Sequence, residues 1–334
     1  MPEQHLYVGI GNAAIDVVCS VSEEQLLALK LGVTKASCAF LNLATTDQIE
    51  KTLQDWGVEC HYFPGGSAAN TASMLGALGA SCAFIGKIAN DPLGELFKSS
   101  LALRNVAYDT APVADGVACT TRLFAFITPD GERTFAVYHG TSDHLQPSDA
   151  DEALIGNAKI LYVDGYMLAS KNGYPVTKAA MAIAKKHNVP AFFNPSALSV
   201  IDGWRSQVDE IIGAADGIIC NEEEATYLTG TGDARSALEA LAGDSKFACV
   251  TAGANGAWAR QDGVSHHAPV TTKDVRIVNT NGAGDGFAGG FLYGYLQGWS
   301  LDRTMNLGIA CGIHVLGQTG ARCEGDLSGL LKQV

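Results

Sequence analysis

Residues Val278–Gly298 read "VNTNGAGDGFAGGFLYGYLQG", in which glycines surround a single carboxylate, Asp285, and an apolar run follows. Glycine is unfavourable inside a helix, so this many of them need a physical reason. At Gly282, Ala283 and Gly284, the lack of large side chains lets successive backbone N–H groups point into one small space. A helix that starts near Asp285 adds the positive end of its dipole, so the pattern predicts an anion-binding turn.

A second interpretation of the same stretch needs no ligand. A strand over Asp274–Val278 and a helix from near Asp285 would meet in a tightly packed glycine turn, with Asp285 as an ordinary helix N-cap. This stretch alone does not separate the two interpretations, so the rest of the chain has to decide between them.

The composition describes a folded, acidic protein. At roughly 150 residues a domain, a chain of 334 residues is expected to form one large domain or two unequal ones. Hydrophobic residues make up 47% and charged residues 17%, which allows a well-buried core and excludes a disordered chain. The net charge of −13 argues against nucleic acid or an anionic membrane as a partner, so a phosphate would have to be bound locally.

Signals for export or membrane insertion are not expected. The residues MPEQHLYVGIGN lack a cationic stretch followed by a long apolar one, and no window approaches about 18 apolar residues. The nine cysteines lie singly in apolar segments without a Cys-x-x-Cys motif, so they are expected to be reduced core residues. We therefore expect a cytoplasmic protein, monomeric or homodimeric, whose partner is a small molecule.

Short apolar runs alternate with segments of helical period along most of the chain. Six runs have the length and flanks of buried strands: LYVGIG, CAFIG, ILYVDG, PAFFNPS, GIICN and FACVTAG. The helical segments between them include Ala69–Leu78, Pro175–Lys186, Glu222–Tyr227 and Ala234–Leu241. This alternation predicts an α/β fold with a doubly wound, mostly parallel central sheet flanked by helices, whose ligands lie beyond the carboxyl ends of the strands.

Two segments interrupt that alternation. Val17–Phe63 combines a helical insertion with the extended run KASCAFLNL, and Val117–Tyr138 alternates about a Pro-Asp-Gly turn as a hairpin does. Both are expected to contribute to a small β-sheet lid over the strand ends. The expected division is into a core and a lid, with residues 1–13, 64–114 and 141–334 in the core and residues 14–63 and 115–140 in the lid.

The segment Phe63–Ala80, FPGGSAANTASMLGALGA, places two glycines and two polar side chains at the start of a helix. Gly65 and Gly66 allow a ligand to approach closely, and Ser67 and Asn70 can bind substrate hydroxyl groups. A helix N-terminus with Ser67 as its cap is the simpler alternative.

The segment IGNAAIDVV places Asn12 and Asp16 after the first predicted strand. Its two glycines suggest a dinucleotide-binding turn, but the third glycine is absent and Asp16 follows too soon for one. Asp16 can instead accept hydrogen bonds from two hydroxyl groups of a sugar. The alternative is a solvated acid at a strand end.

Two further strand ends carry residues suited to a phosphate donor. In CNEEEA, Asn221 and Glu224 lie three positions apart at a helix start and can hold a hydrated Mg²⁺, the alternative being a helix cap with a solvated face. In VTAGANGA, Thr251, Gly253 and Gly256 suit a close backbone approach to a phosphate or ribose. A glycine turn without a ligand is the alternative there.

Together these motifs resemble the PfkB-type, or ribokinase-like, family of carbohydrate and nucleoside kinases over essentially the full length of the chain. TNGAGDGFAGG is similar to the family's anion hole and catalytic base, and the Gly-Gly, Asn-x-x-Glu and Thr-x-Gly-x-x-Gly segments fall in the family's order. Within the family, GNAAIDV, GGSAANTA, NEEEA and NTNGAGDGFAGGFL resemble the branch that phosphorylates adenosine. The resemblance implies a ribokinase-like fold and ATP-dependent phosphorylation of a nucleoside 5′-hydroxyl, with adenosine converted to AMP.

The resemblance also assigns roles in catalysis. Asp285 is implied to be the base that takes the proton of the substrate hydroxyl, and the backbone amides of Gly282, Ala283 and Gly284 to bind the transferring phosphoryl group. Arg133, in the lid hairpin, is implied to reach the phosphates when the lid closes. These roles fit phosphoryl transfer, which needs positioning and charge stabilisation more than covalent chemistry.

Further residues are implied to bind the nucleoside or the phosphate donor. The ribose hydroxyls are assigned to Asp16 and Asn70. The other nucleoside contacts are assigned to Asn12, Gly65, Gly66, Ser67 and Tyr166. ATP and Mg²⁺ are assigned to Asn221, Glu224, Thr251, Gly253 and Gly256.

Two positions depart from the family pattern. Asn279 stands where the family usually has an acid that helps bind K⁺ or Na⁺, so a monovalent-cation site is expected to be weak. In DGYMLAS, Tyr166 supplies only part of the aromatic surface that adenosine-phosphorylating members place beside the base. The alternatives are a sugar kinase acting on ribose, fructose or a related acceptor, and a non-catalytic nucleoside-binding protein, against which the intact Asp285 turn argues.

Overall fold

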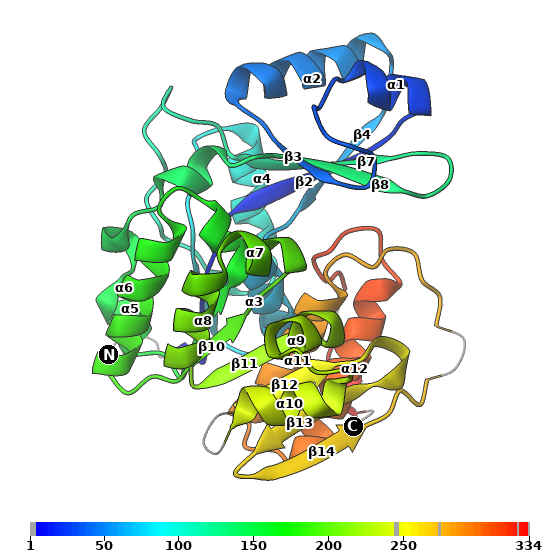
Figure 1. Ribbon diagram of the computed structural model, residues 1–334. Helices are drawn as coiled ribbons and strands as arrows, with labels where there is room; N and C mark the ends of the chain where they lie inside the picture. The colour runs from blue at the N-terminus through cyan, green and yellow to red at the C-terminus, as the bar shows by residue number, and fades with distance from the viewer. Residues whose placement is uncertain (1–4, 244–246, 273–274, 326, 333–334) are drawn as a thin grey trace.

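The computed structural model describes residues 5–243, 247–272, 275–325 and 327–332, which form two β-sheets with helices around them (Figure 1). The larger sheet has the strand order β14-β13-β12-β11-β10-β9-β1-β5-β6, parallel except for the pairs β12–β13 and β13–β14. Its strands are β1 (Tyr7–Ile10), β5 (Cys82–Ile85), β6 (Val106–Ala107), β9 (Ile160–Asp164), β10 (Ala191–Asn194), β11 (Gly217–Asn221), β12 (Phe247–Thr251), β13 (Ala257–Gln261) and β14 (Val264–Ala268). The chain winds one way from β1 to β6 and the other way from β9 to β12, which confirms the predicted doubly wound sheet.

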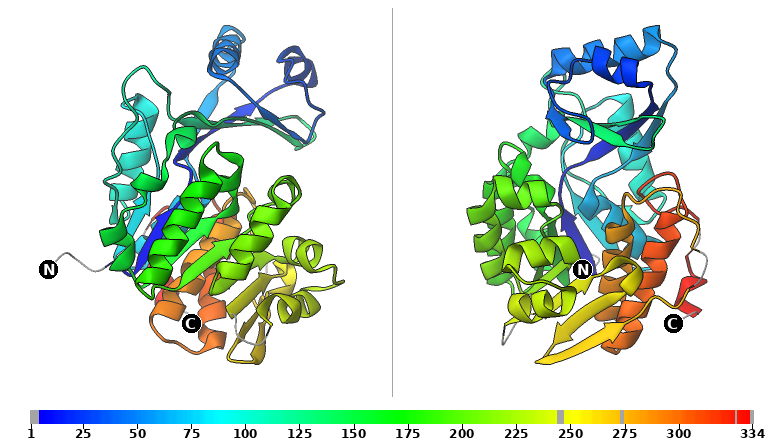
Figure 2. Two further views of the ribbon diagram at one scale, coloured as in Figure 1. Left: turned by 60° about the vertical axis from the view of Figure 1, so that its left-hand side comes forward. Right: turned by 45° about the vertical axis from the view of Figure 1, so that its right-hand side comes forward.

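Helices cover both faces of this sheet (Figure 2). One face carries α3 (Ser67–Ala77), α4 (Pro92–Ala102), α11 (Ala283–Leu296) and α12 (Leu301–Leu316). The other carries α5 (Glu152–Gly156), α6 (Gly173–Lys186), α7 (Leu198–Gly203), α8 (Arg205–Ala214), α9 (Glu222–Thr229) and α10 (Ala234–Ala242). Both faces need this cover because successive side chains of a strand point to opposite faces and both are apolar. In β9, Tyr162 packs in the core cluster that contains α3 and α11, and Val163 packs in the one that contains α6.

A smaller sheet lies over the carboxyl ends of these strands (Figures 1 and 2). Its order is β3-β8-β7-β2-β4. Its strands are β2 (Ala14–Ser20), β3 (Cys38–Phe40), β4 (Cys60–Pro64), β7 (Thr121–Ile127) and β8 (Arg133–Tyr138), and its outer helices are α1 (Glu23–Ala28) and α2 (Leu43–Asp55). This is the small sheet predicted from the two interruptions, including the hairpin β7–β8.

The inner face of the small sheet carries Asp16. Alternate residues of β2 are buried with the outer helices, so Asp16 between them points to the large sheet. Strand pairing aligns Asp16 with Phe63 and Leu123, Leu123 with Val137, and Val137 with Phe40. Residues paired in this way share a face, so one carboxylate lies in a row of four apolar side chains; we call these five residues the inner row.

The strand predicted over Asp274–Val278 is wrong where the structure describes it. Residues 275–278 form no strand, and Asp274 lies outside the described residues. The backbone N–H groups of Val278 and Asn279 instead donate to the Leu316 carbonyl at the end of α12, at 2.8 and 3.3 Å. Ile277 and Val278 are exposed, so the β-branched pattern reflects a segment held against a helix end and not a sheet.

All nine cysteines are free thiols, and six of them are buried. Cys38 is exposed on the edge strand β3, so the expectation of a core residue is wrong there. Within the described ranges, no group of three His, Cys, Asp or Glu side chains could hold a metal ion. In the same ranges, none of the helices combines the length and the apolar character needed to cross a membrane.

The glycines after Asp285 serve helix packing. A Cβ at Gly286 or Gly290 would lie 2.7 Å from Val315 or from the Cys311 sulfur on α12, and one at Gly289 would lie 2.5 Å from Met74 Cβ on α3. Three of the glycines in the opening stretch therefore let α11 pack closely between α12 and α3. This packing brings the start of α11 up to the start of α3.

Gly289→Ala is expected to destabilise the protein. The new Cβ would also lie 3.0 Å from the Thr71 carbonyl oxygen, and such overpacking costs ~1–3 kcal/mol, against a gain of ~1 kcal/mol in helix propensity. Urea unfolding followed by circular dichroism measures the change. Gly213→Ala in α8 is the control, because a Cβ there meets no atom within 4 Å. Equal stability of the two variants would contradict tight packing at Gly289.

Candidate active site

Asp285 lies in the first turn of α11, and side chains from the start of α3 hold it. Ser67 Oγ donates to Asp285 Oδ1 at 2.6 Å, and Asn70 Nδ2 donates to Oδ2 at 2.9 Å. The N-caps of α11 and α3 are Gly282 and Gly66, and neither helix has a side-chain capping bond. The interpretations of Asp285 and Ser67 as helix caps are therefore wrong. Two sites predicted separately from the sequence meet at one carboxylate.

Burial sets the protonation behaviour of the carboxyl groups here. It raises the pKa of Asp285 to about 6, against the hydrogen bonds from Ser67 and Asn70 and the charge of Arg322, which lower it. It raises the pKa of Asp16 to about 7, where Arg322 opposes the rise and the charge of Asp285 adds to it. Carboxyl groups that titrate this close to neutrality can exchange protons with a bound hydroxyl group.

Two glycines between β4 and α3 allow the chain to pass beside Asp16 and Asn12. A Cβ at Gly65 would lie 2.6 Å from Asp16 Oδ1, and one at Gly66 would lie 2.2 Å from the Asn12 carbonyl oxygen. Gly66 also has a φ of +86°, which other residues rarely adopt. Both positions therefore need glycine for the sites around Asp16, Asn12 and α3 to come together.

Asn12 connects this region to the short helix η3 (Gly165–Ala169). Its Nδ2 donates to the Tyr166 carbonyl at 3.1 Å, and its Oδ1 accepts from Ser170 Oγ at 3.0 Å. Ser170 Oγ also lies 3.2 Å from His139 Nδ1. Tyr166 therefore contacts Asn12 through its backbone, and its side chain is exposed.

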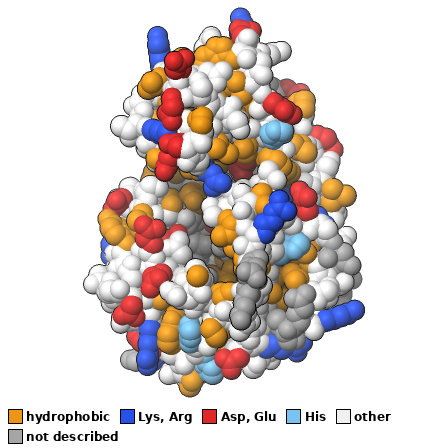
Figure 3. All heavy atoms as spheres, turned by 90° about the vertical axis from the view of Figure 1, so that its right-hand side faces the viewer, with side chains coloured by type: hydrophobic (Ala, Val, Ile, Leu, Met, Phe, Trp, Pro, Cys, Tyr) orange, Lys and Arg blue, Asp and Glu red, His pale blue; other side chains and the backbone are white. Residues whose placement is uncertain are grey.

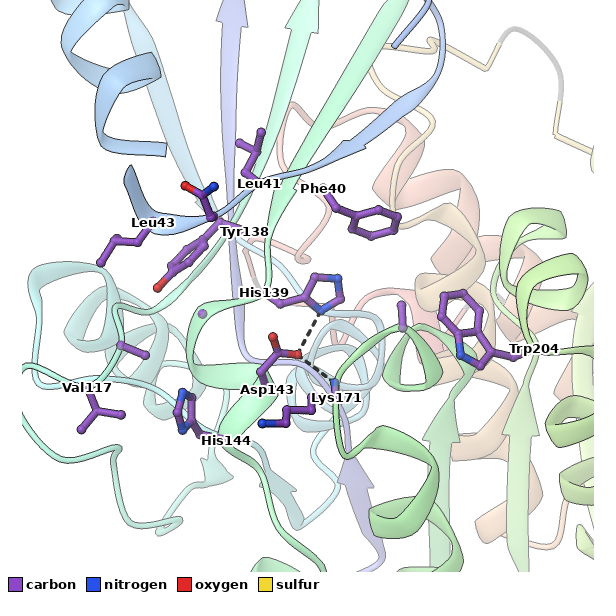
Figure 4. Close-up of a pocket in the computed structure, with 14 residues that line it drawn as sticks. Phe40, Leu41, Leu43, Val117, Tyr138, His139, Asp143, His144, Lys171 and Trp204 are labelled. Atoms are coloured by element: carbon purple, nitrogen blue, oxygen red, sulfur yellow. Dashed lines mark hydrogen bonds and ion pairs between the residues drawn. The ribbon is translucent and has the colours of Figure 1, made fainter. Parts of the chain in front are cut away.

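A cavity of about 710 Å³ opens beside His139, between the small sheet and the large one (Figure 4). Its aromatic lining comes from both sides, with Phe40 on β3, Tyr138 and His139 at the end of β8, and Trp204 at the start of α8. The Phe40 and His139 rings lie 5.5 Å apart between centroids. Figure 3 shows the surface hollowed between the two parts, with apolar side chains gathered there. His139 lines the cavity, and its contact with Ser170 links the cavity wall to Asn12.

The turn before α11 is open on one side. Gly282 has a φ of +78°, and a Cβ there would lie 2.4 Å from the Ala321 carbonyl oxygen. A Cβ at Gly284 would meet no atom within 4 Å, so the space in front of the first turn, which Ala283 begins, is free of protein. The first amides of a helix have no partner within the helix, and beyond the bond from the Ala283 N–H to the Thr280 carbonyl at 3.4 Å the open space leaves room for an anion.

Arg133 reaches this turn from the small sheet. It begins β8, is half-buried, and donates from Nη1 to Thr280 Oγ1 at 3.3 Å. Thr280 lies two residues before Gly282. The arginine of the small sheet therefore contacts the segment just before this turn, through a hydrogen bond that is exposed to solvent.

Asn221 and Glu224 form a capping box at the start of α9. Asn221 Oδ1 accepts from the Glu224 backbone at 2.8 Å, and Glu224 accepts from Asn221 Nδ2 at 2.7 Å. Burial raises the pKa of Glu224 to about 7, and hydrogen bonds from Asn221 oppose the rise. The helix cap, which was the alternative role of Asn221 and Glu224, is therefore found in the structure. One carboxylate and one amide fit Mg²⁺ that keeps most of its waters and binds phosphate oxygens, not an ion ligated by several carboxylates.

The residues after β12 that were predicted to bind the phosphate donor fall into two groups, those with room for a ligand and one explained by packing. Thr251 pairs with Asn221 across β11 and β12, so both lie at the same carboxyl edge. Gly253 has a φ of +54°, and a Cβ there would meet no atom within 4 Å, which leaves room for a ligand. At Gly256, with φ at +90°, a Cβ would lie 2.0 Å from the Ala268 carbonyl oxygen. Packing of the turn alone explains that glycine.

Sequence reasoning missed two buried residues at this site. Arg322 is 6% exposed and donates to Asn70 Oδ1 at 3.3 Å. Asp164 ends β9, is 1% exposed, and accepts from the Ala68 backbone N–H at 3.1 Å. An acid that ends a fully apolar strand was a usable signal for Asp164. Nothing local marks Arg322, which lies in an irregular segment far along the chain.

Comparison with known proteins identifies the family. Residues 35–324 match the family described as pfkB family carbohydrate kinase. The chain belongs to the pfkB family. A probable sugar kinase from Rhizobium etli CFN 42 and the adenosine kinase from Sinorhizobium meliloti share its fold at a TM-score of 0.87, with 30% and 31% identity, over 99% of this chain and 98% and 99% of theirs. Probable fructokinase-2 from Arabidopsis thaliana is 29% identical over 273 residues, which cover 77% of this chain and 82% of that protein.

Membership of the pfkB family determines the class of reaction. The protein is a kinase with the ribokinase-like fold, and small-molecule kinases of this kind take their phosphoryl group from ATP with the help of Mg²⁺. Direct contacts join Asp285 with Ser67 and Asn70, and Gly65 and Gly66 lie beside Asp16 and Asn12. Gly256 is the predicted residue whose position is explained by packing of its turn, and the side chain of Tyr166 interacts with the charge of Asp285.

Asn279→Asp is expected to increase stimulation of this pfkB-family kinase by K⁺. In the unmutated protein Asn279 Nδ2 donates to the Thr319 carbonyl at 2.6 Å and Oδ1 accepts from the Asn281 N–H at 3.0 Å. A carboxylate would set an oxygen against the Thr319 carbonyl, an arrangement that a cation stabilises. Initial rates in choline, Na⁺ and K⁺ chloride at equal ionic strength measure the effect. Strong K⁺ dependence before mutation would show that backbone carbonyls suffice.

Proposed function

We propose that this kinase transfers the terminal phosphoryl group of ATP to the 5′-hydroxyl of a nucleoside, with adenosine, which gives AMP, as the preferred acceptor. The observation that carries the proposal is the cavity beside His139. About 710 Å³ lined by Phe40, His139 and Trp204 suits an acceptor with an aromatic group in addition to its sugar. The adenosine kinase from Sinorhizobium meliloti, at 31% identity over 99% of both chains, supports the same choice.

The inner row supports a sugar bound between the cavity and Asp285. Asp16 is the acceptor for ribose hydroxyls in this arrangement, and Leu123 and Val137 are its apolar neighbours on the same face. Asn70 keeps one N–H for the acceptor while the other bonds Asp285. The nucleoside then lies with its base toward Phe40 and its 5′-hydroxyl toward α11.

The mechanism follows from what each group can do. Asp285, held by its two donors, accepts the proton of the acceptor hydroxyl as the new phosphate bond forms. The backbone amides of Gly282, Ala283 and Gly284 stabilise the charge on the transferring group, and Arg133 adds a positive charge from the small sheet. ATP supplies the phosphoryl group; Asn221 and Glu224 would hold Mg²⁺, which would neutralise charge on the phosphates.

We further propose that residues 14–63 and 115–140 act as a lid on a core made of residues 1–13, 64–114 and 141–334. The small sheet covers the strand ends, and Arg133 spans the gap. A lid that excludes water limits wasteful hydrolysis of ATP. Such a kinase would serve purine salvage in the cytoplasm, where its nine free thiols stay reduced.

A sugar kinase is the second candidate. Probable fructokinase-2 from Arabidopsis thaliana is 29% identical over 77% of this chain, and the Rhizobium etli relative is named a probable sugar kinase. Asp16 and Asn70 could bind a free sugar as well as a ribose. The two candidates differ in whether the aromatic cavity is filled by the acceptor.

A phosphorylation screen with ATP, Mg²⁺ and a set of nucleosides and free sugars tests the function. We expect kcat/KM for adenosine to exceed that for ribose or fructose, because only the nucleoside fills the aromatic cavity. Chromatography of the phosphorylated product gives the rate and the site of phosphorylation. A higher kcat/KM for fructose than for any nucleoside would replace the first candidate with the second.

The matched control in this screen is Asp285→Asn, which keeps the shape and both neighbours but cannot take a proton. Loss of a general base costs about 10²–10⁴-fold in rate, so we expect kcat to fall within that range. Thermal unfolding establishes that the variant is folded. Wild-type turnover in a folded Asp285→Asn protein would remove Asp285 from the role of base, whatever the acceptor.

Arg133→Ala is expected to lower kcat and kcat/KM together and to leave nucleoside affinity largely unchanged. An arginine supplied to a transferring phosphoryl group can contribute ~10³-fold, and we expect less here because the α11 amides and Mg²⁺ share the charge. Steady-state kinetics and calorimetric binding of adenosine give the two quantities. Glu132→Ala, on the exposed turn beside it, is the control. An unchanged kcat in Arg133→Ala would assign the Thr280 contact to structure alone.

A further inference from the structure

The buried guanidinium of Arg322 lies behind the acceptor side of the site. Nη2 donates to the Gly65 carbonyl at 2.6 Å, Nε donates to Asn70 Oδ1 at 3.3 Å, and Nη1 donates to Ser100 Oγ. Its carbon atom Cζ lies 4.8 Å from the centre of the Phe97 ring. The side chain is therefore fixed by three hydrogen bonds and an aromatic face, in a place that α3, α4 and the glycine turn all reach.

Two of these bonds go to groups that form the site. Arginine has donors only, so it fixes which end of the Asn70 amide faces it. With Oδ1 taken by Arg322, Nδ2 is the end that donates to Asp285. The Gly65 carbonyl belongs to the residue at which a Cβ would lie 2.6 Å from Asp16 Oδ1. One guanidinium thus reaches both carboxylates through a single intervening residue each.

Charge is the second link between Arg322 and the site. Burial lowers the pKa of Arg322 to about 10, and the negative charges of Asp16 and Asp285 are among the groups that oppose this fall. In return its positive charge lowers the pKa of both acids, whose burial raises them. The titratable groups that interact with Asp285 from the surrounding elements are Tyr7 on β1, Asp16 on β2, Tyr162 and Asp164 on β9, Tyr166 on η3, Glu224 on α9 and Arg322.

We propose that Arg322 is a positioning residue of this kinase, which orients the Asn70 amide toward Asp285 and serves as the internal counter-ion of Asp16 and Asp285. The inference rests on the proposed role of Asp285 as the base. Without this cation, two acids that share one water-poor space would have to hold a proton between them near neutral pH. With it, Asp285 is ionised and correctly aimed when the acceptor hydroxyl arrives.

A purely structural role would also make Arg322 sensitive to mutation, since removing a buried charged side chain destabilises most proteins. The test therefore reads the pH dependence of kcat/KM, with adenosine or whichever acceptor the screen identifies. Loss of the cation raises the pKa of the carboxyls, and the base works only when ionised, so activity is lost at a higher pH. We expect the acidic limb of Arg322→Gln to move up by roughly one pH unit or more, and kcat at pH 7 to fall ~10-fold or more.

A double-mutant cycle shows whether Arg322 acts through Asp285. If it does, Arg322→Gln should lower kcat/KM by no more than roughly 3-fold in an Asp285→Asn background, because the base is already absent there. An equal loss in both backgrounds, with an unmoved acidic limb, would overturn the proposal. If Asp285→Asn alone kept full turnover, the role of the base would fail first, which separates that failure from this one.

Two variants control for structure. Arg104→Gln removes another arginine that holds the same C-terminal segment, through the Gly325 carbonyl at 3.0 Å, and Ser100→Ala removes only the Nη1 partner of Arg322. Both should keep the wild-type pH profile. If Arg322→Gln does not fold, Arg322→Lys decides. A lysine keeps the charge but loses the planar fork, so an unmoved acidic limb with a kcat ~10-fold lower supports the proposal, and a wild-type kcat overturns it.

Discussion

The contact between the start of α3 and the start of α11 is the constraint on which the site depends. Asp285 receives its two hydrogen bonds there, from Ser67 and Asn70, which lie more than 200 residues away in the chain. The contact exists because Gly289 lets α11 lie against Met74 of α3. Small residues on α11 therefore determine both how the helices pack and how the Asp285 carboxylate is oriented.

The protein binds phosphate although its net charge is −13. Asp16, Asp164 and Glu224 have pKa values raised to about 7, each mainly by desolvation. A negative net charge repels a polyphosphate at long range, so local features of the site have to attract it. In the mechanism proposed above, the open turn at Gly284 and Arg133, which contacts Thr280, supply that attraction. Such sites discriminate by geometry more than by overall charge.

Much of the fold could be predicted from the sequence because it is encoded locally. The apolar runs that form β1, β9 and β11 are short and flanked by turn residues, and segments with the apolar period of a helix separate them. The predicted strand before Gly282 failed for the opposite reason, since the β-branched residues at 277 and 278 are exposed and held by the end of α12. Local pattern does not say whether a partner strand is present.

Sequence patterns could indicate residues of the candidate site but not the contacts that join them. Glycine, serine and asparagine in Phe63–Ala80 indicated a binding turn, yet nothing in that segment shows that Ser67 would bond Asp285 and not cap its own helix. Arg322 could not be recognised from the sequence because its role depends on contacts with Gly65 and Asn70, which lie 257 and 252 residues earlier. Long-range contacts of this kind need the folded chain.

The central claim is that Asp285, and not Asp16, receives the proton of the acceptor hydroxyl. A crystal structure of the protein with adenosine and a non-hydrolysable ATP analogue tests it most directly. The account predicts the 5′-oxygen at roughly 2.6–3.2 Å from an Asp285 carboxylate oxygen, with the base in the cavity beside Phe40 and His139. A 5′-oxygen bonded to Asp16, with Asp285 bonded only to Ser67 and Asn70, would contradict it.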